Sequence, residues 1–180
     1  MGKRYLIEET VASRILYKGK LVNIREDIVK SNRGRFIREI VEHPGAVAIV
    51  PIIEDKIIMV RQFRQTAKKN LLELPAGTLR SGESPEECAE RELIEETGYK
   101  AGCLKKLLQC YVAPGYNTEV IHIYLATDLA KAEQRLEKDE DIEIVKVNLE
   151  YALRMIERNE IEDAKSIVGI MFLSNFFINI

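Results

Sequence analysis

The sequence predicts an α/β layered domain preceded by a small antiparallel β unit. From residue 46 onward, strand-like apolar runs alternate with segments of helical periodicity, which is typical of α/β domains. Residues 13–42 instead consist of short strand-like runs separated by polar turns. His43-Pro44-Gly45 marks the boundary, so we expect a β unit over residues 1–42 and a main domain over residues 43–180.

The β unit is too small to be stable by itself. Its turns lie at residues 18–20 (KGK) and 31–34 (SNRG), between runs of strand-forming residues. Isolated hairpins are only marginally stable in water. We therefore expect this unit to pack on the main domain or on a second subunit.

The main domain contains the predicted core. Two near-continuous apolar runs, at residues 46–53 and 57–63, are typical of central strands joined by a tight turn. The remaining periodic segments predict strands at 104–112, 120–127 and 142–147, and helices at 84–97, 149–159 and 163–177. With 180 residues, 46% of them apolar, the chain can bury a core without disulfides or structural metals.

The composition excludes several classes of protein. Lys and Arg number 27 against 29 Asp and Glu, so the net charge of -2 creates no field that attracts nucleic acid or an anionic membrane. The three cysteines lack the spacing of a disulfide framework or a zinc site. Because we find no signal peptide and no membrane-spanning run, we expect a soluble cytoplasmic protein with neither a nucleic-acid nor a membrane partner.

Residues 84–97 carry the clearest helix signals. Ser84 is a candidate N-cap, Pro85 suits the first turn, and Glu87 completes a capping box with Ser84. Gly98 follows the helix, at a position where a left-handed residue is favoured.

Three carboxylates share one face of this helix. At 100° per residue, Glu92, Glu95 and Glu96 fall within an arc of about 100°. Like charges at this spacing cost about 0.2–0.5 kcal/mol per pair, and we see no comparable row of Lys or Arg to neutralise them. Clustered hard oxygen ligands suit Mg²⁺ or Mn²⁺. The charge pattern alone is equally compatible with a solvated acidic face.

The residues around this face resemble the Nudix box. Residues 77–99 read GTLRSGESPEECAERELIEETGY and follow the pattern Gly-x5-Glu-x7-Arg-Glu-U-x-Glu-Glu-x-Gly-U, where U is a bulky apolar residue. Tyr99 departs from the aliphatic residue that is more usual at the last position. The resemblance implies the Nudix fold, a mixed β-sheet sandwiched between helices, and hydrolysis of a nucleoside diphosphate linked to another group.

The resemblance extends from residue 46 to residue 168 and is strongest to the ADP-ribose pyrophosphatase branch. Residues 60–64 (VRQFR), 72–77 (LELPAG) and 161–166 (IEDAKS) resemble segments of that branch. Pro114 lies fifteen residues after Tyr99, where a proline is the branch's usual sign of ADP-ribose specificity. Hydrolysis of ADP-ribose to AMP and ribose 5-phosphate is implied. The alternatives are another nucleoside diphosphate derivative, such as GDP-mannose, NADH or FAD, and a non-catalytic nucleotide-binding regulator.

The resemblance also implies a metal site with two or more Mg²⁺ ions, or Mn²⁺ in their place. Its oxygen donors would be Glu92 and Glu96 as principal ligands, Glu95 in an assisting role, and the carbonyl of Ala76. Arg91 and Glu83 would orient the helix and the loop before it through charge-assisted hydrogen bonds.

The group that accepts a proton from the attacking water is expected on a mobile acidic loop. By resemblance Glu140 is favoured for this catalytic role and for metal contact, with Glu137, Asp139 and Glu143 as rivals. Acidic loops are also commonly no more than solvated surface.

Substrate contacts are expected from both parts of the chain. Arg64 is favoured for a phosphate or the terminal ribose because a guanidinium binds such oxygens bidentately, and Arg61 would face the other side of its strand. The resemblance implies further contacts from Arg38, Glu39, Thr78, Ala113, Pro114, Gly115 and Glu119. Strand-edge charges are an alternative explanation of Arg38 and Glu39, and a plain turn is an alternative for residues 113–115.

Two partners are implied by the same resemblance. The first is a small nucleoside diphosphate sugar as substrate. The second is another copy of the chain, in a homodimer where the N-terminal unit docks on, or swaps onto, the partner and helps to form its pocket.

Overall fold

The computed structural model describes residues 7–138 and 140–177. The chain divides into two compact units, which we call the first and the second unit. The first unit comprises Met1–Pro44 and Tyr111–Glu119, and the second comprises Gly45–Cys110 and Val120–Ile180. The segment 111–119 therefore belongs to the first unit, although a division at residue 42 leaves it out.

The first unit is built on a three-stranded antiparallel sheet. Its strands are β1 (Glu9–Lys18), β2 (Asn23–Ser31) and β3 (Gly34–Glu42), in the order β1-β2-β3. The turn after β2 closes at Gly34, whose φ of 130° lies in the region that favours glycine. The predicted antiparallel unit is confirmed, and its first strand begins earlier than the pattern indicated.

The second unit contains a mixed seven-stranded sheet. Its strands are β4 (Ala46–Ile53), β5 (Lys56–Arg64), β6 (Lys69–Glu73), β7 (Ala76–Thr78), β9 (Cys103–Tyr111), β10 (Val120–Thr127) and β12 (Ile142–Asn148). Strand β4 pairs in parallel with β10, whereas β5 pairs antiparallel with β6 and β12. A separate short pair joins β8 (Tyr99–Lys100) to β11 (Ala130–Lys131).

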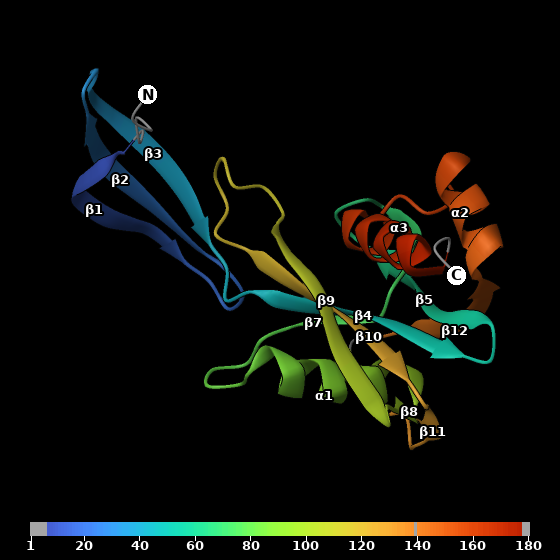
Figure 1. The fold of residues 1–180 in the computed structure, drawn as a ribbon. Coiled ribbons are helices and arrows are strands. Elements are labelled where there is room, and N and C mark those ends of the chain that lie inside the picture. The colour runs from blue at the N-terminus through green and yellow to red at the C-terminus, as the bar shows by residue number, and fades with distance from the viewer. Residues whose placement is uncertain (1–6, 139, 178–180) are drawn as a thin grey trace. The chain divides into compact units, whose positions relative to one another are not determined.

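Helices cover both faces of this sheet. Helix α1 (Pro85–Thr97) lies on one face, and α2 (Leu149–Glu157) and α3 (Ala164–Phe177) lie on the other (Figure 1). Alternation along β4 accounts for the two layers, because Val47 and Ile49 pack with Leu93 of α1 while Ala48 and Val50 pack with apolar residues of α3. The predicted arrangement of a mixed sheet between helices is confirmed.

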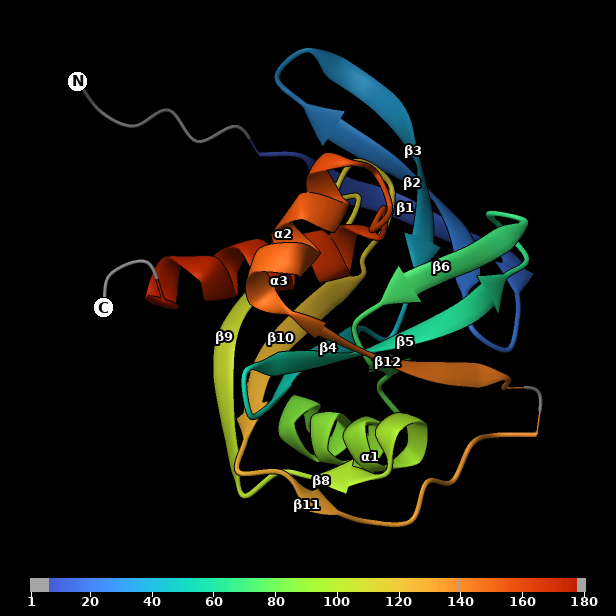
Figure 2. The same cartoon turned by 90° about the vertical axis from the view of Figure 1, so that its right-hand side faces the viewer.

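The central strands separate where the candidate site lies. Strands β4 and β5 pair beside their turn, at Ile52 with Ile57 and at Ile53 with Lys56. Farther along, β7 pairs with β4 and β6 pairs with β5, so the connection at residues 74–75 crosses the fork between β4 and β5 (Figure 2). Ile49 N donates to Pro75 O at 2.8 Å and fixes this connection.

Within the two described ranges, every helix is too short or too polar to cross a bilayer.

Candidate active site

Helix α1 forms as its sequence predicts. Ser84 accepts a hydrogen bond from Glu87 N at 3.3 Å, and the Glu87 carboxylate accepts one from Ser84 N at 2.9 Å. At the other end Gly98 adopts a φ of 67° and donates to Ile94 O at 2.9 Å. The capping box and the glycine cap are both confirmed. These caps fix the rotation of the helix and thus the direction of its glutamates.

Arg91 holds several carboxylates together. Its Nε and Nη2 donate to the two oxygens of Glu83 at 2.7 and 2.9 Å, while Nη1 donates to Glu95 at 2.9 Å and to Glu92. The hydrogen bonds from Arg91 lower the pKa of Glu83 to about 2. No row of cations faces the three glutamates, but the single Arg91 pairs with two of them, Glu92 and Glu95.

Glu96 is the most deeply buried of the three. Its residue exposure is 3%, and its carboxylate accepts a hydrogen bond from Ala76 N at 3.0 Å. Burial raises its pKa to about 8, and the negative charges of Glu92 and Glu140 add to the effect. Burial likewise raises the pKa of Glu92. The site thus concentrates carboxyl groups that ionise reluctantly unless a cation joins them.

Gly77 makes room for the Glu92 side chain. A Cβ atom at Gly77 would lie 2.0 Å from the Glu92 carboxyl carbon, too close for the present position of that side chain. The glycine at the start of the box therefore leaves the space that the Glu92 carboxylate occupies, and a larger residue would force that side chain to move.

Arg64 is bound by an acidic residue that the sequence interpretation gave no role. Its Nε and Nη2 donate to Glu73 at 2.7 and 2.9 Å, and Glu73 also binds Lys165 at the start of α3. Burial opposes ionisation of Glu73, but Arg64 and Lys165 outweigh it, so the pKa of Glu73 is lowered. Arg61 pairs instead with Glu143 on β12 at 2.8 Å.

The acidic loop between β11 and β12 is attached to the end of α1. Ala132 N donates to Gly98 O at 2.8 Å, Gln134 Nε2 to Glu96 O at 2.6 Å, and Arg135 N to Glu95 O at 3.1 Å. These hydrogen bonds pair backbone carbonyls at the end of α1, which have no N–H partner within the helix.

The second half of this loop brings one glutamate toward the site. Glu140 is near enough to Glu92 and Glu96 for its charge to raise the pKa of both. Glu137 pairs with Arg80 at 3.3 Å, and Glu143 pairs with Arg61. Asp139 lies outside the described residues.

The remaining predicted contacts divide between the units. Thr78 lies on β7, where its carbonyl accepts from Arg91 Nη2 at 3.3 Å. The others belong to the first unit: Arg38, Glu39, Ala113, Pro114, Gly115 and Glu119. Arg38 pairs there with Glu8 at 2.5 Å, and Ala113 O accepts from Tyr116 N and Asn117 N in a turn.

The donor set fits a divalent cation by its chemistry. Glu92, Glu95 and Glu96 are hard oxygen donors of the kind that Mg²⁺ and Mn²⁺ prefer, and two of them are buried. Within residues 7–138 and 140–177, however, we find no three acidic, histidine or cysteine side chains already placed around one point. Arg91 now binds two of these glutamates, so those side chains would have to turn to ligate an ion.

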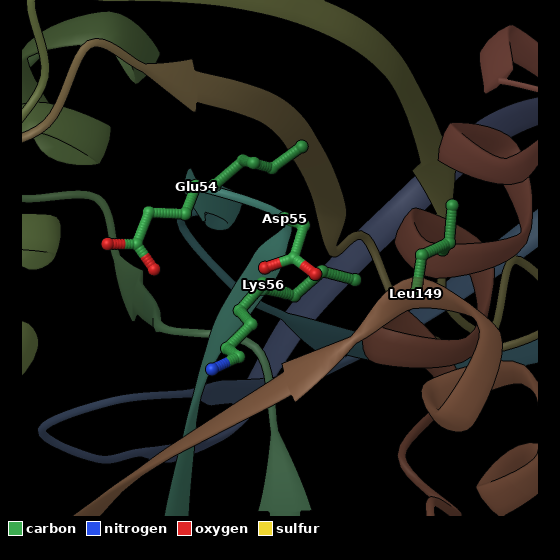
Figure 3. Close-up of a pocket in the computed structure, with 6 residues that line it drawn as sticks. Glu54, Asp55, Lys56 and Leu149 are labelled. Carbon is green, nitrogen blue, oxygen red and sulfur yellow. The ribbon is translucent and has the colours of Figure 1, made fainter.

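A separate pocket of about 200 Å³ lies at the turn between β4 and β5, beside the start of α2. Figure 3 shows Glu54, Asp55 and Lys56 on one side of it and Leu149 on the other. None of the residues that line this pocket is a predicted site residue.

The architecture of a mixed sheet between helices, with an N-terminal three-stranded sheet, is that of the Nudix fold. The model of the NUDIX domain matches residues 42–167, and the chain belongs to this family of hydrolases. Members of the family typically use divalent metal ions.

Three curated relatives are similar over most of their length. The ADP-ribose pyrophosphatase of Bacillus subtilis (strain 168) is 43% identical, with 93% of each chain covered. The methanol dehydrogenase activator of Bacillus methanolicus is 38% identical, covering 96% of this chain and 95% of the relative. The GDP-mannose pyrophosphatase of Citrobacter koseri (strain ATCC BAA-895 / CDC 4225-83 / SGSC4696) is 36% identical, covering 85% and 86%.

The fold also matches a solved structure, described as the crystal structure of ADP compounds hydrolase. The TM-score is 0.87 with 99% of this chain and 98% of that chain covered, at 23% sequence identity. This likeness supports the fold of the chain, including its N-terminal sheet.

Proposed function

We propose that the protein hydrolyses ADP-ribose to AMP and ribose 5-phosphate with the help of Mg²⁺ or Mn²⁺. The observation that carries the proposal is the burial of Glu96 beside Glu92 on α1, since buried carboxylates at such a density need cations. The relative at 43% identity, an ADP-ribose pyrophosphatase, supports the choice of substrate. Pro114 supports it independently, through its distance from the box.

In the proposed reaction, water attacks one phosphorus of the diphosphate. A new P–O bond forms, the bridging P–O bond breaks, and the two products leave as phosphate monoesters. When bound, divalent ions would neutralise phosphate charge, activate the water and stabilise the leaving phosphate. Glu92 and Glu96 would hold them as principal ligands, with Glu95 and the Ala76 carbonyl completing the site.

Each remaining residue has a role that its contacts support. Arg91 would keep hold of Glu83 and so maintain the orientation of α1 when Glu92 and Glu95 turn toward the ions. Glu140 would accept the proton of the attacking water, because its charge already acts on Glu92 and Glu96. Arg64 would bind a phosphate oxygen through the N–H groups that Glu73 leaves free.

The first unit would supply specificity and a dimer contact. We propose that residues 1–42 form the dimerisation unit, that residues 43–180 form the catalytic domain, and that Arg38, Glu39, residues 113–115 and Glu119 help to bind the substrate. Apolar side chains lie exposed on the strands of this unit, among them Ile15, Tyr17 and Ile37. A second copy of the chain would cover such a surface.

The test is phosphate release after coupling to a phosphatase. The panel comprises ADP-ribose, NADH, FAD, GDP-mannose, diadenosine polyphosphates and nucleoside triphosphates, each with Mg²⁺ and with EDTA. Fastest cleavage of ADP-ribose, abolished by EDTA, is expected. Fastest cleavage of GDP-mannose would show that the substrate is GDP-mannose and not ADP-ribose. If no compound of the panel is cleaved although the protein binds Mn²⁺, a non-catalytic regulator is favoured. Such a role is compatible with the relative named methanol dehydrogenase activator.

A further inference from the structure

Lys165 is a buried cation at an unfavourable place. It is the second residue of α3, and only 12% of its side chain is exposed. The N-terminus of a helix carries partial positive charge, so a buried cation there is disfavoured unless other groups stabilise it. Two carboxylates do so, because Lys165 binds Asp163 at 2.9 Å and also Glu73.

Glu73 connects this cation to Arg64. One oxygen of Glu73 accepts from Arg64 Nε, and the other accepts from both Arg64 Nη2 and Lys165 Nζ. The pairing uses two of the five N–H groups of Arg64 and leaves Nη1 and one Nη2 hydrogen for a ligand. The Arg64 side chain is 37% exposed and can meet a ligand, whereas the Glu73 side chain is 2% exposed and faces the protein interior.

The same turn of α3 also fixes the residue after Glu73. Ser166 Oγ accepts from Leu74 N at 2.7 Å and donates to Asp163 Oδ2 at 2.6 Å. The start of α3 thus holds the backbone that leads through Pro75 to the Ala76 carbonyl, as well as the carboxylate that orients Arg64. Arg64 and Lys165 together keep Glu73 ionised, and Lys165 binds the same Glu73 oxygen that accepts from Arg64 Nη2.

We propose that Lys165 is a positioning residue for substrate binding: through Glu73 it orients Arg64, so that the free guanidinium N–H groups meet a phosphate of the substrate. This inference rests on the proposed function for its ligand, a nucleoside diphosphate. By this route α3, which lies on the sheet face opposite α1, influences the affinity for the diphosphate through Glu73 and Arg64.

Lys165→Met in the full-length protein tests the proposal by two independent readouts. The first is the ¹⁵N–¹H spectrum of arginine Nε–H groups, in which the Arg64 signal is assigned by its loss in Arg64→Lys. We expect this signal to shift or broaden in Lys165→Met. The second is steady-state kinetics with the diphosphate that the wild type cleaves fastest, where KM should rise about tenfold while kcat stays within about twofold.

Lys56→Met is the matched control. Lys56 is an exposed cation at the opposite end of β5 from Arg64, so its loss removes a comparable charge far from Glu73. The Arg64 signal and KM should both be unchanged in this variant. Lys165→Arg, which keeps the charge, should recover most of the wild-type KM.

An unchanged Arg64 signal in Lys165→Met overturns the proposal, as does an unchanged KM in an active enzyme. If the wild type cleaves no diphosphate, the proposed function fails, and the Arg64 signal still decides whether Lys165 orients that residue. Thermal melting verifies folding. Should Lys165→Met not fold, Lys165→Gln is read in the same two ways.

Discussion

Arg91 binds Glu83 through two hydrogen bonds, of 2.7 and 2.9 Å, and thereby ties the loop before α1 to the helix face that carries Glu92 and Glu95. Parallel bonds between a guanidinium and a carboxylate are stronger and more specific in direction than a single bond. The pair therefore fixes how the loop enters the helix. Its strength depends on the ionisation of Glu83.

Glu83→Gln should reduce stability at pH 7 and make less difference in acid. The hydrogen bonds from Arg91 hold the folded-state pKa of Glu83 at about 2, below the value of about 4.3 expected for an unfolded chain. Such a depressed pKa stabilises the fold above the unfolded value, and this contribution is lost as the pH falls from there through the folded value. The difference in melting temperature between the two proteins should shrink from pH 7 to pH 3 and vanish only below about pH 2.

Glu90→Gln is the control for this prediction, because Glu90 lies on the exposed side of the same helix. Its melting temperature should track the wild type at every pH. A difference between Glu83→Gln and the wild type that stays constant down to pH 3 would contradict the assigned ion pair.

Glu96→Gln should reduce the hydrolysis rate at least about 100-fold and leave the protein folded. The amide oxygen can still accept the hydrogen bond from Ala76 N, and the variant no longer buries a carboxyl group whose ionisation is opposed by burial. In EDTA the melting temperature should therefore equal or exceed that of the wild type. Near-normal turnover would remove Glu96 from the metal site, and Mn²⁺ binding followed by electron paramagnetic resonance provides a second check.

Glu140→Gln should lower kcat with little change in substrate binding. Glu140 acts electrostatically on Glu92 and Glu96, whereas Glu143 pairs with Arg61 on an exposed surface. Rates are measured beside calorimetric binding of α,β-methylene ADP-ribose. If Glu143→Gln slows the reaction and Glu140→Gln does not, the proton acceptor is Glu143, three residues farther along the chain.

The protein should sediment as a dimer at micromolar concentration. Exposed apolar side chains on the first unit, such as Ile37, are unfavourable in water unless covered. Ile37→Lys should shift sedimentation toward the monomer and reduce activity. A wild-type monomer with full activity would refute the proposed dimer.

Local signals explain why α1 and the central strands could be predicted from the sequence. The capping box at Ser84, the glycine at residue 98 and the continuous apolar runs all act within a few residues. Strands β6 and β7 lack such signals. Residues 69–73 show no alternation of apolar and polar side chains, and β7 has only three residues. Both strands form because β4 and β5 diverge, so that β7 can pair with the edge of β4 and β6 with the edge of β5.

The site could be predicted only where its members lie close in sequence. The spacing of Arg91 and Glu95 permits an ion pair one helical turn apart, and both residues belong to the short motif on α1. The contact of Lys165 with Glu73 spans 92 residues and has no local signature. The burial that raises the pKa of Glu96 is likewise a property of the folded sheet and helix together.

Hydrogen bonds from Ala132, Gln134 and Arg135 attach the acidic loop to the C-terminal end of α1. Helix α1 therefore positions both its own glutamates and this loop. Glu92 and Glu96 are set by its rotation, and the loop that carries Glu140 starts from its end. A rigid displacement of α1 would therefore carry the glutamates and the root of the loop together and preserve their spacing. Insertion of one residue into α1 would instead turn its two ends by about 100° relative to each other and move the loop out of register with the glutamates.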